Sequence, residues 1–164
     1  MAKRGKSLQF GEEEIDELVE MQYGDKRLFA LLTLLFPFVD VTNHHFHIDH
    51  VFPKSRFTKP KLAKAGVSDA DIDEFKEMVN CLPNLQLLEG LENIEKQASL
   101  PAEWIKDSFT SDATRSNYCD NHLLGSVPES LTEFRRFYDA RLQALRSRIE
   151  DMLGSKGVEP QSDR

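Results

Sequence analysis

The sequence predicts an α+β fold that is mostly helical, with one small two-stranded element near its middle. Over most of the 164 residues, apolar side chains recur three or four positions apart, which is the spacing of one helix face. Two short stretches, residues 46–52 and 84–88, are instead typical of strands, and proline or glycine bounds them. A chain of this length suits one domain whose core needs no disulfide or structural metal.

The first two expected helices form the amino-terminal part of the core. Residues 10–25 have an acidic first turn, which the helix dipole favours, and Gly24 is a plausible stop. A second helix from about Asp25 to Phe36 is apolar on most faces, so we expect it to be central, and Pro37 ends it.

The strand at residues 46–52 leads into a basic loop, after which Ser68 is expected to cap a helix that runs to residue 79. The second strand is followed by a turn at Gly90 and a short helix over residues 91–97. Another helix is expected over residues 101–109, because its proline occupies a first-turn position.

A long helix is expected to end the domain. Ser126 and Glu129 form a possible capping box, and an apolar stripe runs from there to Met152. That stripe suits packing on the core or on a partner helix, and core packing is the expectation. The sequence thus predicts a single domain over residues 1–153 and a disordered tail over residues 154–164.

The charge and the cysteine content of the chain argue against several classes of protein and site. A formal net charge of -7 argues against a protein whose whole surface grips nucleic acid. The two cysteines, Cys81 and Cys119, belong to no Cys-x-x-Cys pair, so a four-cysteine zinc site is excluded and two reduced thiols are expected. No stretch suits a membrane span or a signal peptide, so a cytoplasmic location is expected. One run carries only basic charges: Lys54, Arg56, Lys59, Lys61 and Lys64.

The stretch HHFHIDHVFPKS, residues 44–55, holds four of the five histidines. Hydrolysis of a phosphodiester needs a base to deprotonate water and a hard cation to neutralise phosphoryl charge. His50 suits the base, and the side-chain oxygens of Asp49 and Asn93 suit Mg²⁺. Adjacent strand residues point to opposite faces, so the strand must twist or end near Asp49 and His50.

Two segments carry a resemblance to a known family. HIDHVFPKS followed by NLQLLEGLENIEK resembles the HNH endonucleases, also called ββα-metal or His-Me finger nucleases, in an Asp-His-x-x-Pro-x-Ser pattern with asparagines at 84 and 93. The flanking sequence, MQYGDKRLFALLTLLFP before the motif and FHIDHVFPKSRFTK across it, resembles another group. This group is the carboxy-terminal nuclease of bacterial restriction and anti-phage proteins that carry a ParB-like NTPase module. The resemblance implies a ββα-metal core over about residues 46–98, embedded in helices over 11–36 and 101–153.

The resemblance also implies roles for single residues. His50 would be the general base, while Asp49 and Asn93 would hold one divalent metal, with Mg²⁺ expected and Mn²⁺ as the alternative. Asn84, also assigned to the catalytic set, would orient the His50 ring or brace the loop between the strands. Two departures from the family are the long loop over residues 56–82 and the lack of zinc-binding cysteine pairs.

Other residues are expected to support the site or to be structural. Lys96 would sit near substrate phosphate, and Lys54 and Arg56 would contact the DNA backbone. His47 shares a strand face with Asp49, so it could approach the metal or brace the site, and a purely structural role is an equal expectation. The remaining histidines are expected to be solvated or structural: His44, His45 and His122.

We therefore expect a metal-dependent HNH endonuclease that nicks or cuts DNA, as the catalytic part of a restriction or phage-defence system. Its target choice would reside in a ParB-like NTPase or recognition module, in the same protein or in a partner subunit. The alternatives are a non-catalytic DNA- or protein-binding module on the same fold, and an RNA-cleaving toxin.

Overall fold

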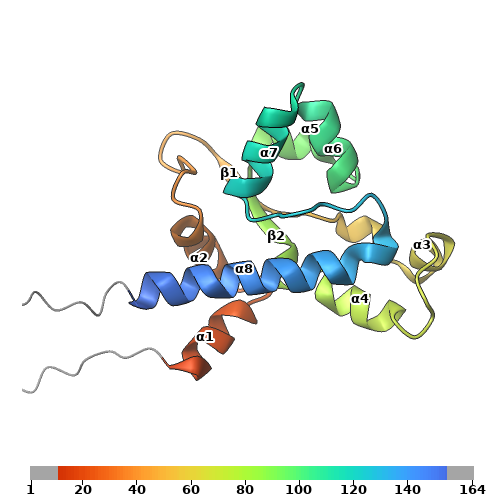
Figure 1. Ribbon diagram of the computed structural model, residues 1–164, viewed down its shortest axis with the longest axis horizontal. Coiled ribbons are helices and arrows are strands. Elements are labelled where there is room, and N and C mark those ends of the chain that lie inside the picture. The colour runs from red at the N-terminus through yellow and green to blue at the C-terminus, as the bar shows by residue number, and fades with distance from the viewer. Residues whose placement is uncertain (1–10, 155–164) are drawn as a thin grey trace, which may run out of the picture.

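The fold is seen in a computed structural model that describes residues 11–154, apart from the side chain of Ile94. The tail expected beyond residue 154 lies outside the described residues. The coarse fold class is confirmed, because the chain is α+β and mostly helical with a two-stranded antiparallel sheet (Figure 1). The helices are α1 (Glu12–Val19), α2 (Leu28–Leu35), α3 (Lys59–Lys64), α4 (Ile72–Met78), α5 (Gly90–Lys96), α6 (Pro101–Ser108), α7 (Asp112–Asn121) and α8 (Phe134–Gly154).

The sheet pairs β1 (Phe46–His50) with β2 (Leu85–Glu89), and β2 continues directly into α5. Asp49 lies opposite Gln86, and His50 lies opposite Leu85. Side chains alternate between the two faces of a strand, so each face has its own neighbours. Leu85 and Leu87 join the core formed with α1 and α2, while Asp49 faces α5.

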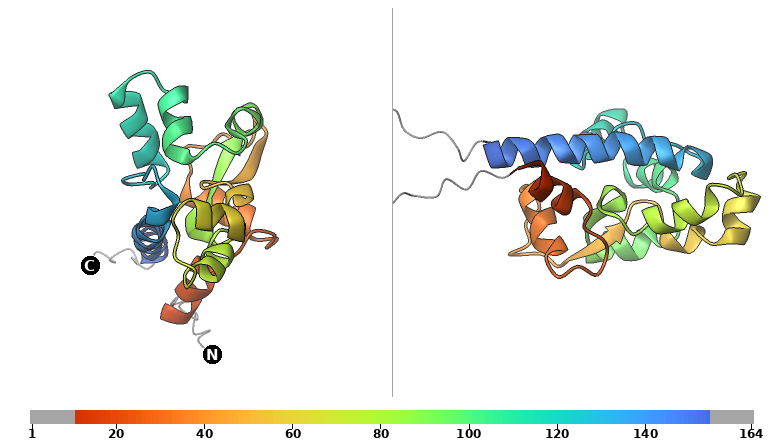
Figure 2. Two further views of the ribbon diagram at one scale, coloured as in Figure 1. Left: turned by 90° about the vertical axis from the view of Figure 1, so that its right-hand side faces the viewer. Right: turned by 90° about the horizontal axis from the view of Figure 1, so that it is seen from below.

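Short 3₁₀ turns complete the chain path: η1 (Lys54–Arg56), η2 (Leu82–Asn84) and η3 (Leu131–Glu133). The last helix, α8, extends along the molecule and contacts α1, α2 and η2 (Figures 1 and 2). Phe134 and Phe137, near its start, are buried in one core with α4 and α6. Leu145 and Ile149, two turns or more later, are buried in the other core with α1 and α2. The terminal apolar stripe thus packs on the core, as expected.

Arg141 interrupts that stripe with a charge, midway along α8, and is 1 % exposed. Its Nη1 donates to the carbonyl oxygens of Pro83 and Leu85 at 2.8 and 2.7 Å, and its Nη2 donates to that of His122 at 3.1 Å. The guanidinium therefore ties α8 both to the start of β2 and to the end of α7. Burial lowers the pKa of Arg141 to about 9, so the group stays protonated at neutral pH.

Several expected boundaries were wrong. The first helix ends at Val19, before Gly24, because the following residues pair with the segment before η2: Tyr23 N–H donates to Asn80 and Leu82 N–H donates to Met21. Backbone pairing outside the helix thus replaced its last expected turn. The segment Lys59–Lys64, expected as an extended loop, is helix α3.

The other differences lie at the starts of helices. Asp71, rather than Ser68, stands at the N-cap of α4, and Ser68 instead stabilises the preceding turn. The capping box expected at Ser126 is wrong, because Ser130 holds the turn that leads into α8. Helix α7 was not expected, although Ser111 and Thr114 form a capping box at its start. Among the helices described in residues 11–154, none has the length and apolar character that a bilayer crossing requires.

Replacing Arg141 with leucine should lower the free energy of unfolding by about 3–5 kcal/mol, because three buried carbonyl groups lose their donors. Urea unfolding followed by circular dichroism measures the change. The matched control is Arg136→Leu on the same helix, where the guanidinium is exposed and should matter by no more than about 0.5 kcal/mol. Equal effects of the two substitutions would contradict the structural role of Arg141.

Candidate functional site

The candidate site is built where β1 ends. Asp49 and His50 are its last two residues, and their side chains contact different partners on opposite faces of the sheet. The strand ends at the point where the sequence required it to twist or end. After it, Val51 N–H still donates to the carbonyl of Asn84, and Pro53 begins the turn into η1.

On one face, the carboxylate of Asp49 is held by two side chains. Lys96 Nζ lies 3.0 Å from Asp49 Oδ2 and also donates to the His50 carbonyl oxygen at 2.7 Å. Gln86 Nε2 donates to the same Oδ2 at 3.2 Å from the facing strand. Lys96 is buried at 1 % side-chain exposure, and burial lowers its pKa while the charge of Asp49 opposes that shift. One ammonium group thus fixes the last two residues of β1.

A further hydrogen bond extends this network to α7. Tyr118 Oη donates to Gln86 Oε1 at 3.0 Å, so Gln86 bridges Tyr118 and Asp49. Burial raises the pKa of Tyr118, and the negative charges of Glu92 and Asp49 raise it further. Tyr118 therefore stays a neutral donor, and Gln86, with 1 % exposure, has both ends of its amide satisfied.

On the other face, the ring of His50 contacts Asn80 and Tyr23. His50 Nε2 lies 3.0 Å from Asn80 Oδ1, and the His50 and Tyr23 ring centroids are 4.8 Å apart. An amide oxygen only accepts hydrogen bonds, so Nε2 carries the proton and Nδ1 of the neutral ring is the basic nitrogen. Burial lowers the pKa of His50, Asn80 and Asp49 oppose that shift, and Lys54 and Lys96 add to it.

Asn84 does not contact the His50 ring. It is fully buried, and its Oδ1 accepts from Phe52 N–H at 2.9 Å while its Nδ2 donates to the carbonyls of Phe52 and Val79. Its side chain therefore joins the two ends of the long connection between β1 and β2. Of the two roles expected of Asn84, these bonds agree with bracing the loop between the strands, whereas the His50 ring is held by Asn80.

Asn93 lies on α5, three residues before Lys96 and so on the same side of that helix. Because Lys96 contacts Asp49, we infer from helix periodicity that Asn93 lies near the helix side that faces β1. Asp49 Oδ2 is occupied by Lys96 and Gln86, whereas Oδ1 makes no hydrogen bond within the described residues. One carboxylate oxygen and one amide oxygen are hard donors that suit a divalent cation such as Mg²⁺, with water completing its shell.

The four histidines of the stretch separate in the structure. In the described part of the chain, no three His, Cys, Asp or Glu side chains gather around one point; Asp49 with Asn93 is a different kind of donor pair. His44 Nδ1 pairs with Glu89 at 2.9 Å, and His45 is exposed. His47 lies over the start of α5, where a Cβ on Gly90 would be 3.5 Å from its Nε2. His122, in the far segment, is buried as expected.

The expected phosphate contacts divide into two groups. Lys96 is enclosed by the protein, where it positions Asp49, and its expected contact with substrate phosphate stays a prediction. Lys54 is exposed, and Arg56 is half-buried with Nε bonded to the carbonyl of Ala98 at 3.0 Å. Only the exposed part of the basic run remains available for a phosphate.

Sequence reasoning missed Gln86, Tyr118, Asn80 and Tyr23. Aligning the two expected strands as an antiparallel pair would have placed Gln86 opposite Asp49. A polar residue within an otherwise apolar strand was the available signal. No local pattern identifies Tyr118, Asn80 or Tyr23, because tertiary packing alone brings them to the sheet.

Comparison with known proteins adds no assignment, since no family model and no curated protein matches this sequence.

A double-mutant cycle on Asp49 and Lys96 tests the buried pair. Lys96→Met alone should lower the free energy of unfolding by about 3–5 kcal/mol, because the Asp49 carboxylate loses its cation in a site with 13 % exposure. Asp49→Leu with Lys96→Met should be less destabilised than the sum of the single variants, by more than about 1 kcal/mol. Urea unfolding of all four proteins gives the coupling, and strictly additive effects would show that the pair is unimportant.

Proposed function

We propose that this protein is a metal-dependent endonuclease of the HNH type that hydrolyses phosphodiester bonds in DNA. The observation that carries the proposal is the pair at the end of β1: a histidine anchored through Nε2, next to a carboxylate held by a lysine of the following helix. The order of strand, strand and helix, with Asn93 on that helix, agrees with the family resemblance of the sequence.

The chemistry assigned to the carboxylate face is cation binding. Asp49 and Asn93 would hold one divalent cation, which when bound supplies charge neutralisation at the scissile phosphate and the leaving oxygen. Lys96 and Gln86 hold Asp49 Oδ2 in one position, so the second oxygen is presented without a rearrangement of the side chain. Preorganisation of this kind is what a charge-stabilising site requires.

The base is His50. Asn80 fixes the ring through Nε2, and Nδ1 is then free to take a proton from a water molecule that attacks phosphorus. The charges of Asp49, Lys54 and Lys96 all act on the ring, so it lies within electrostatic range of the carboxylate although the two side chains leave opposite faces. Asn84 and Lys96 are positioning residues that keep the end of β1 in place.

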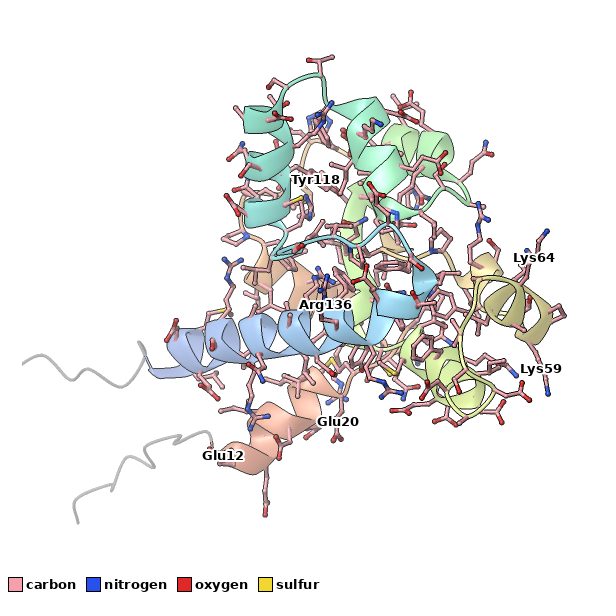
Figure 3. All side chains as sticks on the ribbon, turned by 45° about the vertical axis from the view of Figure 1, so that its right-hand side comes forward. Glu12, Glu20, Lys59, Lys64, Tyr118 and Arg136 are labelled. Atoms are coloured by element: carbon pink, nitrogen blue, oxygen red, sulfur yellow. The ribbon has the colours of Figure 1, made fainter. Side chains whose placement is uncertain are left out.

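The surface proposed for the DNA backbone is the basic surface, defined as Lys54, Lys59, Lys61 and Lys64 on η1 and α3. All four are exposed, and Figure 3 shows Lys59 and Lys64 pointing outward from α3. A cavity of about 490 Å³ beside α3 is lined in part by Arg56, Lys61 and Lys64. Contacts of this kind are sequence-neutral, so target choice would come from a ParB-like NTPase or recognition module, as the resemblance implies.

Replacing His50 with alanine should lower the rate of plasmid nicking in Mg²⁺ or Mn²⁺ by about 10²–10⁴-fold, because the proton acceptor is lost. Agarose-gel assays of supercoiled plasmid measure the rate, and EDTA should abolish it in the parent protein. His45→Ala is the matched control, since this neighbouring histidine is exposed and should be dispensable.

DNA binding should survive His50→Ala. Equal nicking by the His50 and His45 variants would refute the assigned base. Binding without any metal-dependent cleavage, alone or with a recognition module, would favour the non-catalytic module, and preferential cleavage of structured RNA would favour the toxin.

Removing single charges from the basic surface should weaken DNA binding equally for all sequences. Lys59→Ala or Lys64→Ala should each reduce the slope of log K against log salt concentration by about one, if each contacts one phosphate. Fluorescence anisotropy at several salt concentrations measures the slope. Lys106→Ala on α6 is the control, and a slope reduced to the same extent by that variant would argue against a localised contact surface.

A further inference from the structure

A second candidate site lies beside the outer edge of β2, away from the basic surface. A cavity of about 480 Å³ opens there between α7, the start of α5 and the segment that follows α2. Its volume is in the range of about 300–1,000 Å³ that is typical of ligand pockets. The cavity plays no part in the proposed hydrolysis.

The charge of the cavity is entirely acidic. Asp40, Glu89 and Glu92 line it, and none of the described residues around it is lysine or arginine. Burial raises the pKa of Glu92, and the neighbouring carboxylates of Glu89 and Glu95 raise it further. Glu89 has His44 as a partner, whereas Glu92 has no ion pair within the described residues. Carboxylates that line one cavity with no lysine or arginine beside them favour a cation and disfavour a phosphate.

The inner wall is aromatic and ends in an unpartnered polar atom. His122 is 7 % exposed, and its buried Nδ1 has no hydrogen-bond partner. Its ring centroid lies 5.2 Å from that of Phe38 and 4.4 Å from that of Tyr118, and Figure 3 labels Tyr118 on α7. Burial and the charge of Arg141 lower the pKa of His122 to about 3, so the ring adds no positive charge to the cavity.

We propose that this cavity is a docking site for an arginine side chain of a partner protein. The guanidinium would bond Glu92 and stack against the aromatic wall. Guanidinium is the cation that combines planar stacking with forked donation to carboxylates. A nucleic acid would bring phosphates against three carboxylates, which is why a protein is the better occupant.

The test uses the ¹⁵N-labelled full chain titrated with Nα-acetyl-arginine amide, followed by chemical-shift changes. The uncharged isostere Nα-acetyl-citrulline amide is the matched control ligand. Shifts should centre on Leu87, Glu92 and His122, with a Kd of about 1–10 mM for so small a probe. Citrulline amide should bind about tenfold more weakly, because its hydrogen bonds to the carboxylates lack charge assistance.

Glu92→Gln should weaken arginine amide about tenfold while preserving the shape of the cavity. Glu103→Gln on α6 is the control, since Glu103 is exposed and lies outside the cavity lining, and it should leave binding unchanged. The proposal would be overturned by equal binding of citrulline amide, by shifts centred elsewhere, or by an unaffected Glu92→Gln variant. It would also be overturned if the nucleoside cytidine saturated the cavity in place of arginine amide. None of these measurements depends on nuclease activity.

Discussion

A guanidinium buried in the middle of α8 is the constraint on which the rest of the structure depends. Arg141 bonds the carbonyls on both sides of Asn84, namely those of Pro83 and Leu85, and so fixes the entry into β2. Asn84 in turn holds Phe52, just beyond the end of β1. Because no carboxylate neutralises Arg141 among the described residues, its charge is balanced by carbonyl dipoles and by the Phe36 ring, at 5.9 Å. One side chain of the last helix thereby sets how the two strands meet.

The distribution of charge reconciles an acidic protein with a proposed role on DNA. Basic residues gather on η1 and α3, whereas Asp40, Glu89 and Glu92 gather around the cavity beside α7. The network from Tyr118 through Gln86 to Asp49 connects the cavity wall to the candidate site. A net charge of -7 therefore conceals two local surfaces of opposite sign. Each surface suits a different kind of partner.

Periodicity in the sequence was enough to predict both strands, the helix after them and the terminal helix, because these segments carry their own apolar patterns. The chemistry of phosphodiester hydrolysis and the resemblance to HNH nucleases singled out Asp49, His50, Asn84 and Asn93, although their contacts could not be predicted. Asn80 holds the His50 ring only because the connection over residues 51–84 folds back on the sheet. No sequence pattern distinguishes Arg141, since its partners are carbonyl groups from segments far away in the chain.

The separation of β1 from β2 has a consequence for how the chain reaches its native state. The strands cannot close as a simple hairpin, because residues 51–84 with η1, α3, α4 and η2 lie between them. Closing so long a connection carries an entropic penalty before any strand pairing compensates for it. We therefore expect α3 and α4 to condense first and shorten the effective loop, with strand pairing among the last events. In such an order, Asp49 and His50 acquire their neighbours only when folding is nearly complete, so partly folded chains would lack the assembled site.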